Sequence, residues 1–394
     1  MRRKSFPEFL KKHGDAMKIV IAPDKYKGNM TSPELCEIIR AGFLAEIPSA
    51  EIICLPLADG GDGTVEALIT ARHGERRQVT VHDPLGKPLR AEFGVFDSGR
   101  SAVLEMASAS GLAQLKKEQL DPLRADTFGT GELIRAALDA GAESLTIGIG
   151  GSATTDGGSG MARALGYRFL DQDGHDLPPG PANLVRLEKI EISQVDPRLF
   201  KTRIRAACDV TNPLLGPTGA VAVYGPQKGV TPETAPILEA ALERLAAVWK
   251  KQGMIDSAKS PGDGAAGGLG AGLRAFCKAE LTSGARLIIQ VSGLEKQLEG
   301  ADLLITGEGC TDSQTDAGKL CGEVALTAHR HNVPVLLLSG ALKGDPEPFG
   351  KTFDYAFSTS TGAHANLEEA IRAGKRDLAF TVRNLARLIK RGVR

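Results

Sequence analysis

The sequence is short of several features, and each shortage excludes a class of protein. Lysine plus arginine and aspartate plus glutamate both number 48, so no excess of charge favours nucleic acid or a membrane surface as a partner. No apolar run approaches the roughly 18 residues that span a bilayer. A P-loop is also excluded, because Gly318-Lys319 is followed by Leu320 rather than by serine or threonine.

Cysteine and tryptophan are scarce as well. The six cysteines are scattered without a Cys-x-x-Cys pair, and Cys54 and Cys208 lie inside apolar runs. This predicts small buried side chains in a reducing compartment, and hence a cytoplasmic protein. Trp249 is the single tryptophan of the sequence. It falls in an amphipathic segment (232–252) and is expected in a core or an interface. Residues 1–16 are basic without an apolar stretch, which indicates an N-terminal extension rather than a secretory signal.

Glycine, by contrast, is concentrated in one stretch. Six of the thirteen residues of Gly148–Gly160 are glycine. The apolar run Leu145–Ile147 precedes them and a helical pattern from Met161 follows. Glycine lets backbone N–H groups approach an anion, and a helix N-terminus adds positive charge. A tight structural turn is the alternative, but the added serines, threonines and Asp156 favour a phosphate-type ligand site.

The order of the expected elements predicts an α/β fold with two domains. Apolar strands at 18–22 and 51–57 alternate with helices, the first of them expected to begin with Ser32 as N-cap and Pro33 at its first position. This alternation predicts a parallel sheet. Short strands and turns follow, and the α/β pattern returns near 286. We therefore expect a discontinuous Rossmann- or flavodoxin-like domain (17–76 plus 286–394) with a mixed α/β domain (77–285) inserted.

Acidic residues follow the ends of several expected strands. Because ligands of open parallel sheets lie beyond the carboxyl ends of the strands, we expect these side chains near a site. Carboxylates beside phosphate-type loops are what Mg²⁺-dependent phosphoryl transfer requires, with one carboxylate free to accept a hydroxyl proton. Four lysines could balance an anion. The residues are, for the acids, Asp24, Asp59, Asp62, Asp156, Asp209, Glu308 and Asp312, and for the lysines, Lys25, Lys27, Lys228 and Lys319.

Two other functions fit part of the sequence. Gly148-x-Gly150-x-x-Ala153 after a strand, with Asp171 and Asp173 further on, matches a dinucleotide fingerprint and would indicate a nicotinamide-dependent oxidoreductase. A non-catalytic sugar-acid-binding protein is a third interpretation, which the number of carboxylates disfavours.

Taken together, these stretches resemble the type-1 glycerate kinase family, over nearly everything from Met17 onward. The resemblance lies in seven segments that occur in order: Ala22–Asp24 with Tyr26–Gly28, Ala58–Thr64, Gly148–Gly160, Ala207–Leu214, Gly225–Gly229, Gly264–Gly270, and Thr306–Gly309 with Asp312–Thr315.

The resemblance implies ATP- and Mg²⁺-dependent phosphorylation of D-glycerate, commonly at the 2-hydroxyl to give 2-phosphoglycerate, with 3-phosphoglycerate as the alternative product. It also implies two α/β domains with the active site in the cleft between them. The partners would be D-glycerate and ATP, without nucleic acid or membrane, and a homodimer stays open.

With the resemblance, the sequence predicts a role for each candidate residue. Asp209 is the expected general base. The further assignments are Asp312 and Lys27 as catalytic, Asp59 and Asp62 as Mg²⁺ ligands, Asp24, Lys27, Asp59, Ser152 and Thr154 as substrate contacts, and Gly150, Gly151, Gly307, Glu308 and Gly309 as contacts of nucleotide or phosphate.

Four positions depart from the family's usual pattern. Cys310 and Thr311 stand where the family often has Arg-Ile, Ala317 replaces a histidine, and Lys25 replaces a serine. If the family's arginine contacts an anion, Lys319 is the expected substitute. These departures bear on substrate specificity more than on the class of reaction.

Overall fold

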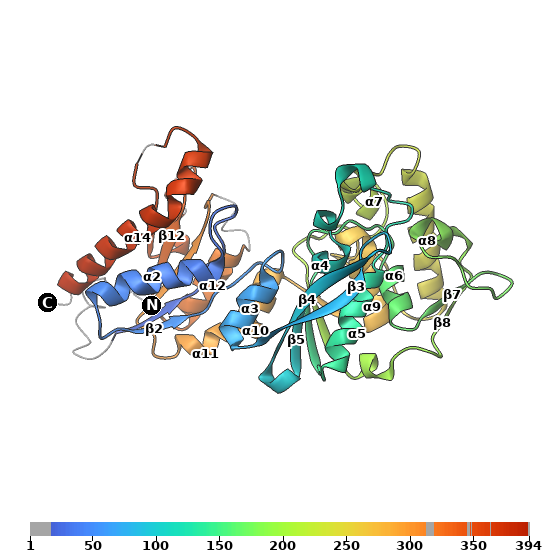
Figure 1. Ribbon diagram of the computed structural model, residues 1–394, viewed down its shortest axis with the longest axis horizontal. Helices are drawn as coiled ribbons and strands as arrows, with labels where there is room; N and C mark the ends of the chain where they lie inside the picture. The colour runs from blue at the N-terminus through green and yellow to red at the C-terminus, as the bar shows by residue number, and fades with distance from the viewer. Residues whose placement is uncertain (1–16, 313–318, 345–346, 348, 363, 393–394) are drawn as a thin grey trace. The chain divides into compact units, whose positions relative to one another are not determined.

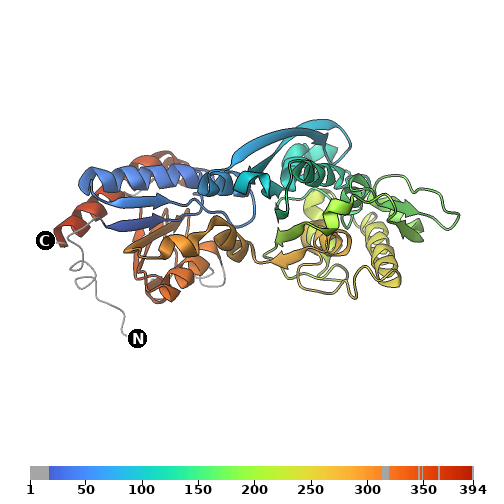
Figure 2. The same cartoon turned by 90° about the horizontal axis from the view of Figure 1, so that it is seen from below.

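The computed structural model describes residues 17–312, 319–344, 347, 349–362 and 364–392, which form two compact units (Figures 1 and 2). One unit holds the described residues up to Asp59, Thr70–Arg72 and the chain from Ile288 onward, and the other holds Gly60–Ile69 and His73–Leu287. The expected boundaries thus differ at Gly60–Ile69, at residues 73–76 and at residues 286–287, all of which belong to the second unit. The expected extension 1–16, Ala317 and Ser313–Thr315 lie outside the described residues.

The first unit contains a five-stranded sheet in which every pairing is parallel. The order is β2-β1-β11-β12-β13, so in sequence terms the strands run 2-1-3-4-5. This is the flavodoxin-like order, whose switch point lies between β1 and β11. The strands are β1 (Lys18–Ile21), β2 (Glu51–Cys54), β11 (Leu303–Glu308), β12 (Val335–Ser339) and β13 (Tyr355–Ser358).

Two long helices, α2 (Ser32–Glu46) and α14 (Leu367–Gly392), lie side by side in this unit and share its core (Figure 1). The N-cap of α2 is Thr31, whose side chain accepts a hydrogen bond from the Glu34 N–H, so the prediction of Ser32 was wrong. Ser32 Oγ instead donates to the Pro23 carbonyl (2.6 Å) and accepts from the Leu57 N–H (3.0 Å), which ties the loops after β1 and β2 together. The other helices are α11 (Leu294–Leu298), α12 (Leu320–Arg330) and α13 (Phe349–Thr352), and α3 (Thr64–Arg72) and α10 (Gly284–Ser292) carry the chain from one unit to the other.

The second unit is built on a six-stranded mixed sheet in the order β10-β9-β6-β5-β4-β3. The expected short strands with turns are found as β3, β4 and β5, which pair antiparallel. From β5 to β10 all pairings are parallel, so the carboxyl ends of four strands share one edge. The strands are β3 (Glu75–His82), β4 (Pro88–Phe96), β5 (Ser101–Glu105), β6 (Ser144–Gly148), β9 (Arg203–Ala207) and β10 (Glu280–Thr282), and β7 (Arg168–Leu170) and β8 (Lys189–Glu191) form a separate hairpin.

Helices pack around this sheet and enclose the core of the second unit. Trp249 is fully buried and meets Phe276 edge-on at 5.5 Å, which confirms the expected core position. In the described ranges, no helix combines the length and the apolar character that crossing a bilayer requires. The helices are α4 (Ala107–Ser110), α5 (Phe128–Asp139), α6 (Ser159–Ala164), α7 (Ala220–Tyr224), α8 (Ala235–Lys251) and α9 (Ala265–Cys277), with 3₁₀ turns at Asp97–Gly99, Leu112–Gln114, Lys117–Gln119, Pro181–Arg186, Pro197–Phe200 and Pro226–Lys228.

The two glycine-rich segments of the sequence pack on each other, backbone against backbone. Gly157 donates its N–H to the Gly267 carbonyl at 3.1 Å. Gly267 has φ +68°, and a Cβ there would lie 1.9 Å from the Thr154 carbonyl oxygen. Glycine at this position therefore satisfies both a left-handed backbone and a contact that leaves no room for a side chain.

Gly267→Ala should strongly destabilise the second unit. Gly174→Ala is the matched control, because Gly174 also has positive φ (+80°) but no atom within 4 Å of the place that a methyl group would take. The left-handed backbone costs each variant about 1–2 kcal/mol, and the clash adds about 1–3 kcal/mol to Gly267→Ala alone. Urea unfolding measures both, and equal losses in the two variants would contradict the interlocked loops.

Candidate functional site

Three of the predicted loops converge at the carboxyl edge of the second sheet. Gly148 pairs with Ala207, so Gly150 and Asp209 each lie two residues beyond paired positions on neighbouring strands. Gly60 joins them: it has φ +88°, and a Cβ on it would lie 2.4 Å from Ala207 Cβ. A Cβ on Gly148 would lie 2.6 Å from the Gly60 carbonyl oxygen. This backbone contact brings the loop of Asp62 to the strand ends of the glycine loop and of Asp209.

Glu105, at the end of β5, fixes the start of α3 at this edge. Its Oε1 accepts a hydrogen bond from the Val65 N–H at 2.8 Å. Thr64 Oγ1 donates to the Gly61 carbonyl at 2.6 Å and closes the turn that carries Asp62. The sequence reasoning missed Glu105, although an acid at the end of an expected strand was the same signal that found Asp209.

Gly150 and Gly151 are the exposed part of the glycine loop. The Gly151 carbonyl accepts a hydrogen bond from the Leu112 N–H at 2.9 Å. For the N–H groups of Gly150 and Gly151, no acceptor is found within the part of the chain that the structure describes. N–H donors on two exposed residues at a strand end are suited to an anion. Their predicted role as phosphate contacts stays a prediction.

Ser152 and Thr154 face the protein interior, where their groups bond to one another. Both are buried, at 5% and 0% exposed. Ser152 Oγ accepts from the Thr154 N–H at 3.1 Å and lies 3.3 Å from the Ala266 carbonyl oxygen. The buried ammonium of Lys228 donates to Ser152 Oγ (3.2 Å) and to the Thr154 carbonyl (2.6 Å). Burial lowers the pKa of Lys228 to about 7, against the opposing charge of Asp156.

Asp156 is fully buried and holds the loop to the start of α5 and α6. Its Oδ2 accepts hydrogen bonds from the Thr127 N–H (3.0 Å), the Thr127 hydroxyl (2.7 Å) and the Gly160 N–H (2.9 Å). Its Oδ1 accepts from the Gly158 N–H at 3.2 Å. Asp156 therefore stabilises the loop from inside the protein, where its carboxylate has no access to a ligand.

Asp209 is exposed directly after β9. Its Oδ1 accepts a hydrogen bond from the N–H of Gly284, the first residue of α10, at 2.8 Å. This bond to a helix N-terminus orients the carboxylate. The predicted general base is thus held in one orientation beside the glycine loop.

In the first unit, three predicted acids gather at the switch point between β1 and β11. The Asp24 N–H donates to the Gly307 carbonyl at 2.8 Å, which joins the two strand ends. Burial, then the charges of Asp59 and Glu308, raise the pKa of Asp24 to about 7, although the Lys25 N–H donates to Oδ1 at 2.7 Å. Carboxylates that repel one another in a partly buried place are a donor set that suits a divalent cation.

The loop after β11 is held by side chains that the sequence reasoning did not use. Thr311 Oγ1 lies 3.0 Å from Glu308 Oε1 and 2.9 Å from Ser339 Oγ, so this departure from the family pattern serves packing of the loop. Gly307 is required by the sheet, because a Cβ there would lie 2.2 Å from the Leu338 carbonyl oxygen. Gly309 is half-buried, and a Cβ on it would be 3.3 Å from the Lys27 N atom.

The remaining predicted residues of the first unit lie nearer the solvent. Lys27 is exposed at the tip of the loop after β1. Asp312 forms an ion pair with Lys319 at 3.5 Å, each about two-fifths exposed. Cys310 is a half-buried free thiol. Lys319 thus contacts an acid three residues beyond Gly309.

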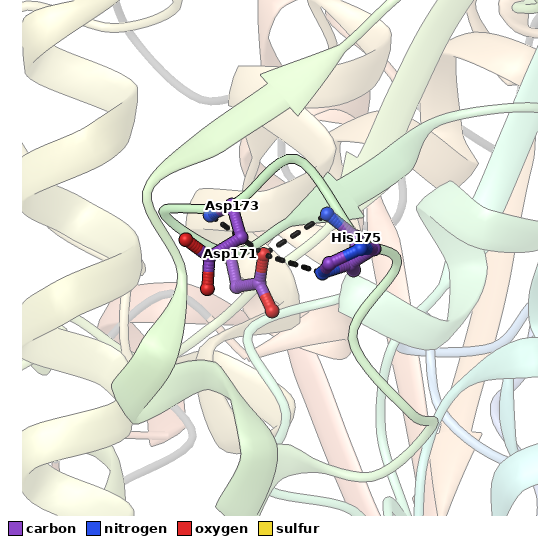
Figure 3. A group of neighbouring side chains, drawn as sticks. All are labelled: Asp171, Asp173 and His175. Atoms are coloured by element: carbon purple, nitrogen blue, oxygen red, sulfur yellow. Dashed lines mark hydrogen bonds and ion pairs between the residues drawn. The ribbon is translucent and has the colours of Figure 1, made fainter.

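The residues of the dinucleotide alternative do not form a nucleotide site. Helix α6 begins at Ser159, so Ala153 is not at the start of a helix as the fingerprint requires. Asp171 and Asp173 lie with His175 on the turn between β7 and β8 (Figure 3). Asp171 Oδ1 accepts hydrogen bonds from the Asp173 N–H (3.0 Å) and the His175 N–H (2.9 Å), which is the pattern of a structural turn.

Known proteins are similar to this chain over nearly its whole length. The model of the glycerate kinase family matches residues 19–390. A glycerate kinase of Bacillus subtilis (strain 168) is 44% identical over 375 residues, covering 95% of this chain and 98% of the relative. A glycerate 2-kinase of Escherichia coli (strain K12) is 43% identical, covering 96% and 99%. A crystal structure of a candidate glycerate kinase 2 from Salmonella typhimurium LT2 superposes with a TM-score of 0.88 at 46% identity, covering 96% and 99%.

Asp24→Asn should change how stability depends on pH. The Asp24 pKa is raised in the folded protein to about 7, so wild-type stability falls as pH rises from about 4 through about 7. The asparagine variant avoids that loss and should be more stable above pH 7 by about 1–3 kcal/mol, with the advantage vanishing near pH 4. Urea unfolding of both proteins between about pH 4 and pH 8, without divalent cations, measures this difference. Parallel curves of stability against pH for the two proteins would contradict it.

Asp156→Asn should destabilise the glycine loop, because an amide NH₂ would then face N–H and O–H donors. We expect a loss of about 2–4 kcal/mol in the free energy of unfolding. Asp173→Asn, at an exposed position, is the control and should change stability by less than about 0.5 kcal/mol. A small effect at Asp156 would show that its hydrogen bonds do not support the loop.

Proposed function

This chain belongs to the glycerate kinase family, and from that premise we propose that it transfers the γ-phosphoryl group of ATP to the 2-hydroxyl of D-glycerate. The observation that carries the proposal is the convergence of Gly150, Asp209 and the loop of Asp62 at one sheet edge. An anion cradle next to an exposed carboxylate is the pair of features that the reaction needs.

Asp209 acts as the general base in this proposal. Its carboxylate accepts the proton of the 2-hydroxyl as that oxygen bonds to the γ-phosphorus. The bond between phosphorus and the bridging oxygen breaks, and ADP leaves with that oxygen. The hydrogen bond from the Gly284 N–H supports the role, because it fixes the direction of the carboxylate.

Gly150 and Gly151 stabilise the phosphoryl group during transfer. Their exposed N–H groups can donate to its oxygens as negative charge shifts in the transition state. Ser152 and Thr154 contribute by shaping the loop, since their side chains are buried. This replaces the direct substrate contacts that the sequence suggested for them.

Mg²⁺ would be held in the first unit by Asp59 with Asp24 and Glu308. Asp62, the second ligand suggested by the sequence, belongs to the other unit and stays a prediction. The raised pKa of Asp24 supports this set, because a divalent cation offsets the repulsion among the carboxylates. When bound, the ion would neutralise part of the negative charge of the phosphates. Gly309 would lie beside the nucleotide, Lys27 would pair with the glycerate carboxylate, and Asp312 with Lys319 would serve the substrate or phosphate.

The partners proposed are ATP and D-glycerate alone. All six cysteines are free thiols, which supports the reducing, cytoplasmic setting expected from the sequence. The names of the relatives support the 2-hydroxyl over the 3-hydroxyl, since one of them is a glycerate 2-kinase.

Asp209→Asn should lower kcat by about 10²–10⁴-fold, because the amide keeps an acceptor for the Gly284 N–H but cannot take the proton. Coupled ADP release with D-glycerate, ATP and Mg²⁺ measures turnover, and NMR of the product identifies the phosphorylated hydroxyl. Asp256→Asn, at an exposed position, is the control and should match wild type.

Three results would count against the proposal. ADP release no faster than an ATPase blank would remove the activity. Near-normal turnover of Asp209→Asn would remove the base. A phosphate on the 3-hydroxyl would correct the position of transfer.

A further inference from the structure

One segment singled out in the sequence, Gly225–Gly229, has no part in the function proposed above. It contains Lys228, which is only 2% exposed and is among the largest fully buried side chains of the described residues. Burying an ammonium costs free energy unless hydrogen bonds inside the protein replace those it made with water. The position of Lys228 therefore calls for a specific reason.

The backbone around Lys228 is a tight turn that aims the side chain inward. The Lys228 N–H donates to the Gly225 carbonyl at 2.8 Å, and the Val230 N–H donates to the same carbonyl at 3.1 Å. Gly229, with φ +89°, ends the 3₁₀ turn of Pro226–Lys228. The two hydrogen bonds to the Gly225 carbonyl thus fix the backbone on both sides of the lysine.

The ammonium of Lys228 meets the glycine loop at two points. Nζ donates to the Thr154 carbonyl at 2.6 Å and to Ser152 Oγ at 3.2 Å. Ser152 Oγ also accepts from the Thr154 N–H at 3.1 Å, so the three groups form one closed arrangement. A carbonyl turned toward a buried cation fixes the peptide plane that contains it.

This arrangement directly follows the two exposed N–H groups in the chain. Gly151 immediately precedes Ser152 in the chain. The peptide that follows Ser152 is fixed because the Ala153 N–H donates a hydrogen bond to the Ser110 carbonyl at 3.0 Å. Without such restraints, Gly150 and Gly151 would be free to adopt many backbone conformations, because glycine is the least restricted residue type. The direction of their N–H groups hence depends on how the turn at Ser152–Thr154 is held.

We propose that Lys228 is a positioning residue, which holds the Ser152–Thr154 turn so that the N–H groups of Gly150 and Gly151 point at the transferred phosphoryl group. The proposal rests on the proposed function, because it assigns the phosphoryl oxygens as the ligand of these N–H groups. Lys228 touches neither substrate nor nucleotide. Its ammonium acts through the Thr154 carbonyl and the Ser152 hydroxyl.

The test compares Lys228→Met with Lys201→Met, which removes an exposed lysine from the same unit. At a temperature where both variants are folded by circular dichroism, Lys228→Met should lower kcat by about 10- to 100-fold with a smaller change in KM, since loss of orientation acts on the transition state. Lys201→Met should keep both constants. A wild-type kcat in folded Lys228→Met would overturn the proposal.

A double-mutant cycle with Ser152→Ala separates positioning from direct contact. If Lys228 acts through the turn, the double variant should be about as slow as the slower single variant, because both changes disturb the same element. Losses that multiply would indicate an independent contact between Lys228 and the phosphate and would overturn the proposal. If Lys228→Met does not fold, Ser152→Ala alone carries the test, and a wild-type kcat there is the contrary result.

Hydrogen exchange gives an outcome that does not depend on the reaction. Amides of residues 149–158 should exchange faster in Lys228→Met than in wild type, while those of α8 stay unchanged. If wild type turns over no D-glycerate, the proposed function fails, yet this exchange still decides whether Lys228 holds the loop. Unchanged exchange over 149–158 would overturn the positioning role, whatever the activity.

Discussion

The structure of the site depends on close approach between backbones at the carboxyl edge of the second sheet. Gly60 lies against Ala207 and Gly148, and Gly267 lies against Thr154, at separations that admit no Cβ. Backbone groups can approach this closely only where side chains are missing. The glycines thus set where Asp62, Asp209 and the exposed N–H groups lie, and any chemistry at this edge follows from that packing.

Buried and exposed groups of the glycine loop have separate tasks. Asp156, Ser152, Thr154 and Lys228 form an internal set of hydrogen bonds that gives the loop its shape. Gly150 and Gly151 are left at the surface, and their N–H groups have no acceptor among the described residues. Buried hydrogen bonds that fix the loop from inside are one way to preorganise the N–H donors of its glycines for a transition state.

Sequence patterns were sufficient for the fold, but not for side-chain directions within the candidate site. Apolar runs and strand-end acids predicted both sheets, and Asp24, Asp59 and Glu308 do meet at the switch point of the first one. Ser152 and Thr154 were expected to face the ligand, yet contacts with Ala266 and Lys228, remote in sequence, turn them inward. The same limit applies to Gly60–Ile69, which belong to the second unit, where Gly60 lies against Ala207.

In the proposed reaction, the phosphoryl group is transferred at the edge formed by Gly150, Gly151 and Asp209. A crystal structure with D-glycerate, Mg²⁺ and a non-hydrolysable ATP analogue tests this placement most directly. We expect a γ-phosphate within hydrogen-bonding distance of the Gly150 and Gly151 N–H groups, and the glycerate 2-hydroxyl within that distance of the Asp209 carboxylate. A γ-phosphate bound away from this loop, or a glycerate hydroxyl facing another acid, would contradict it.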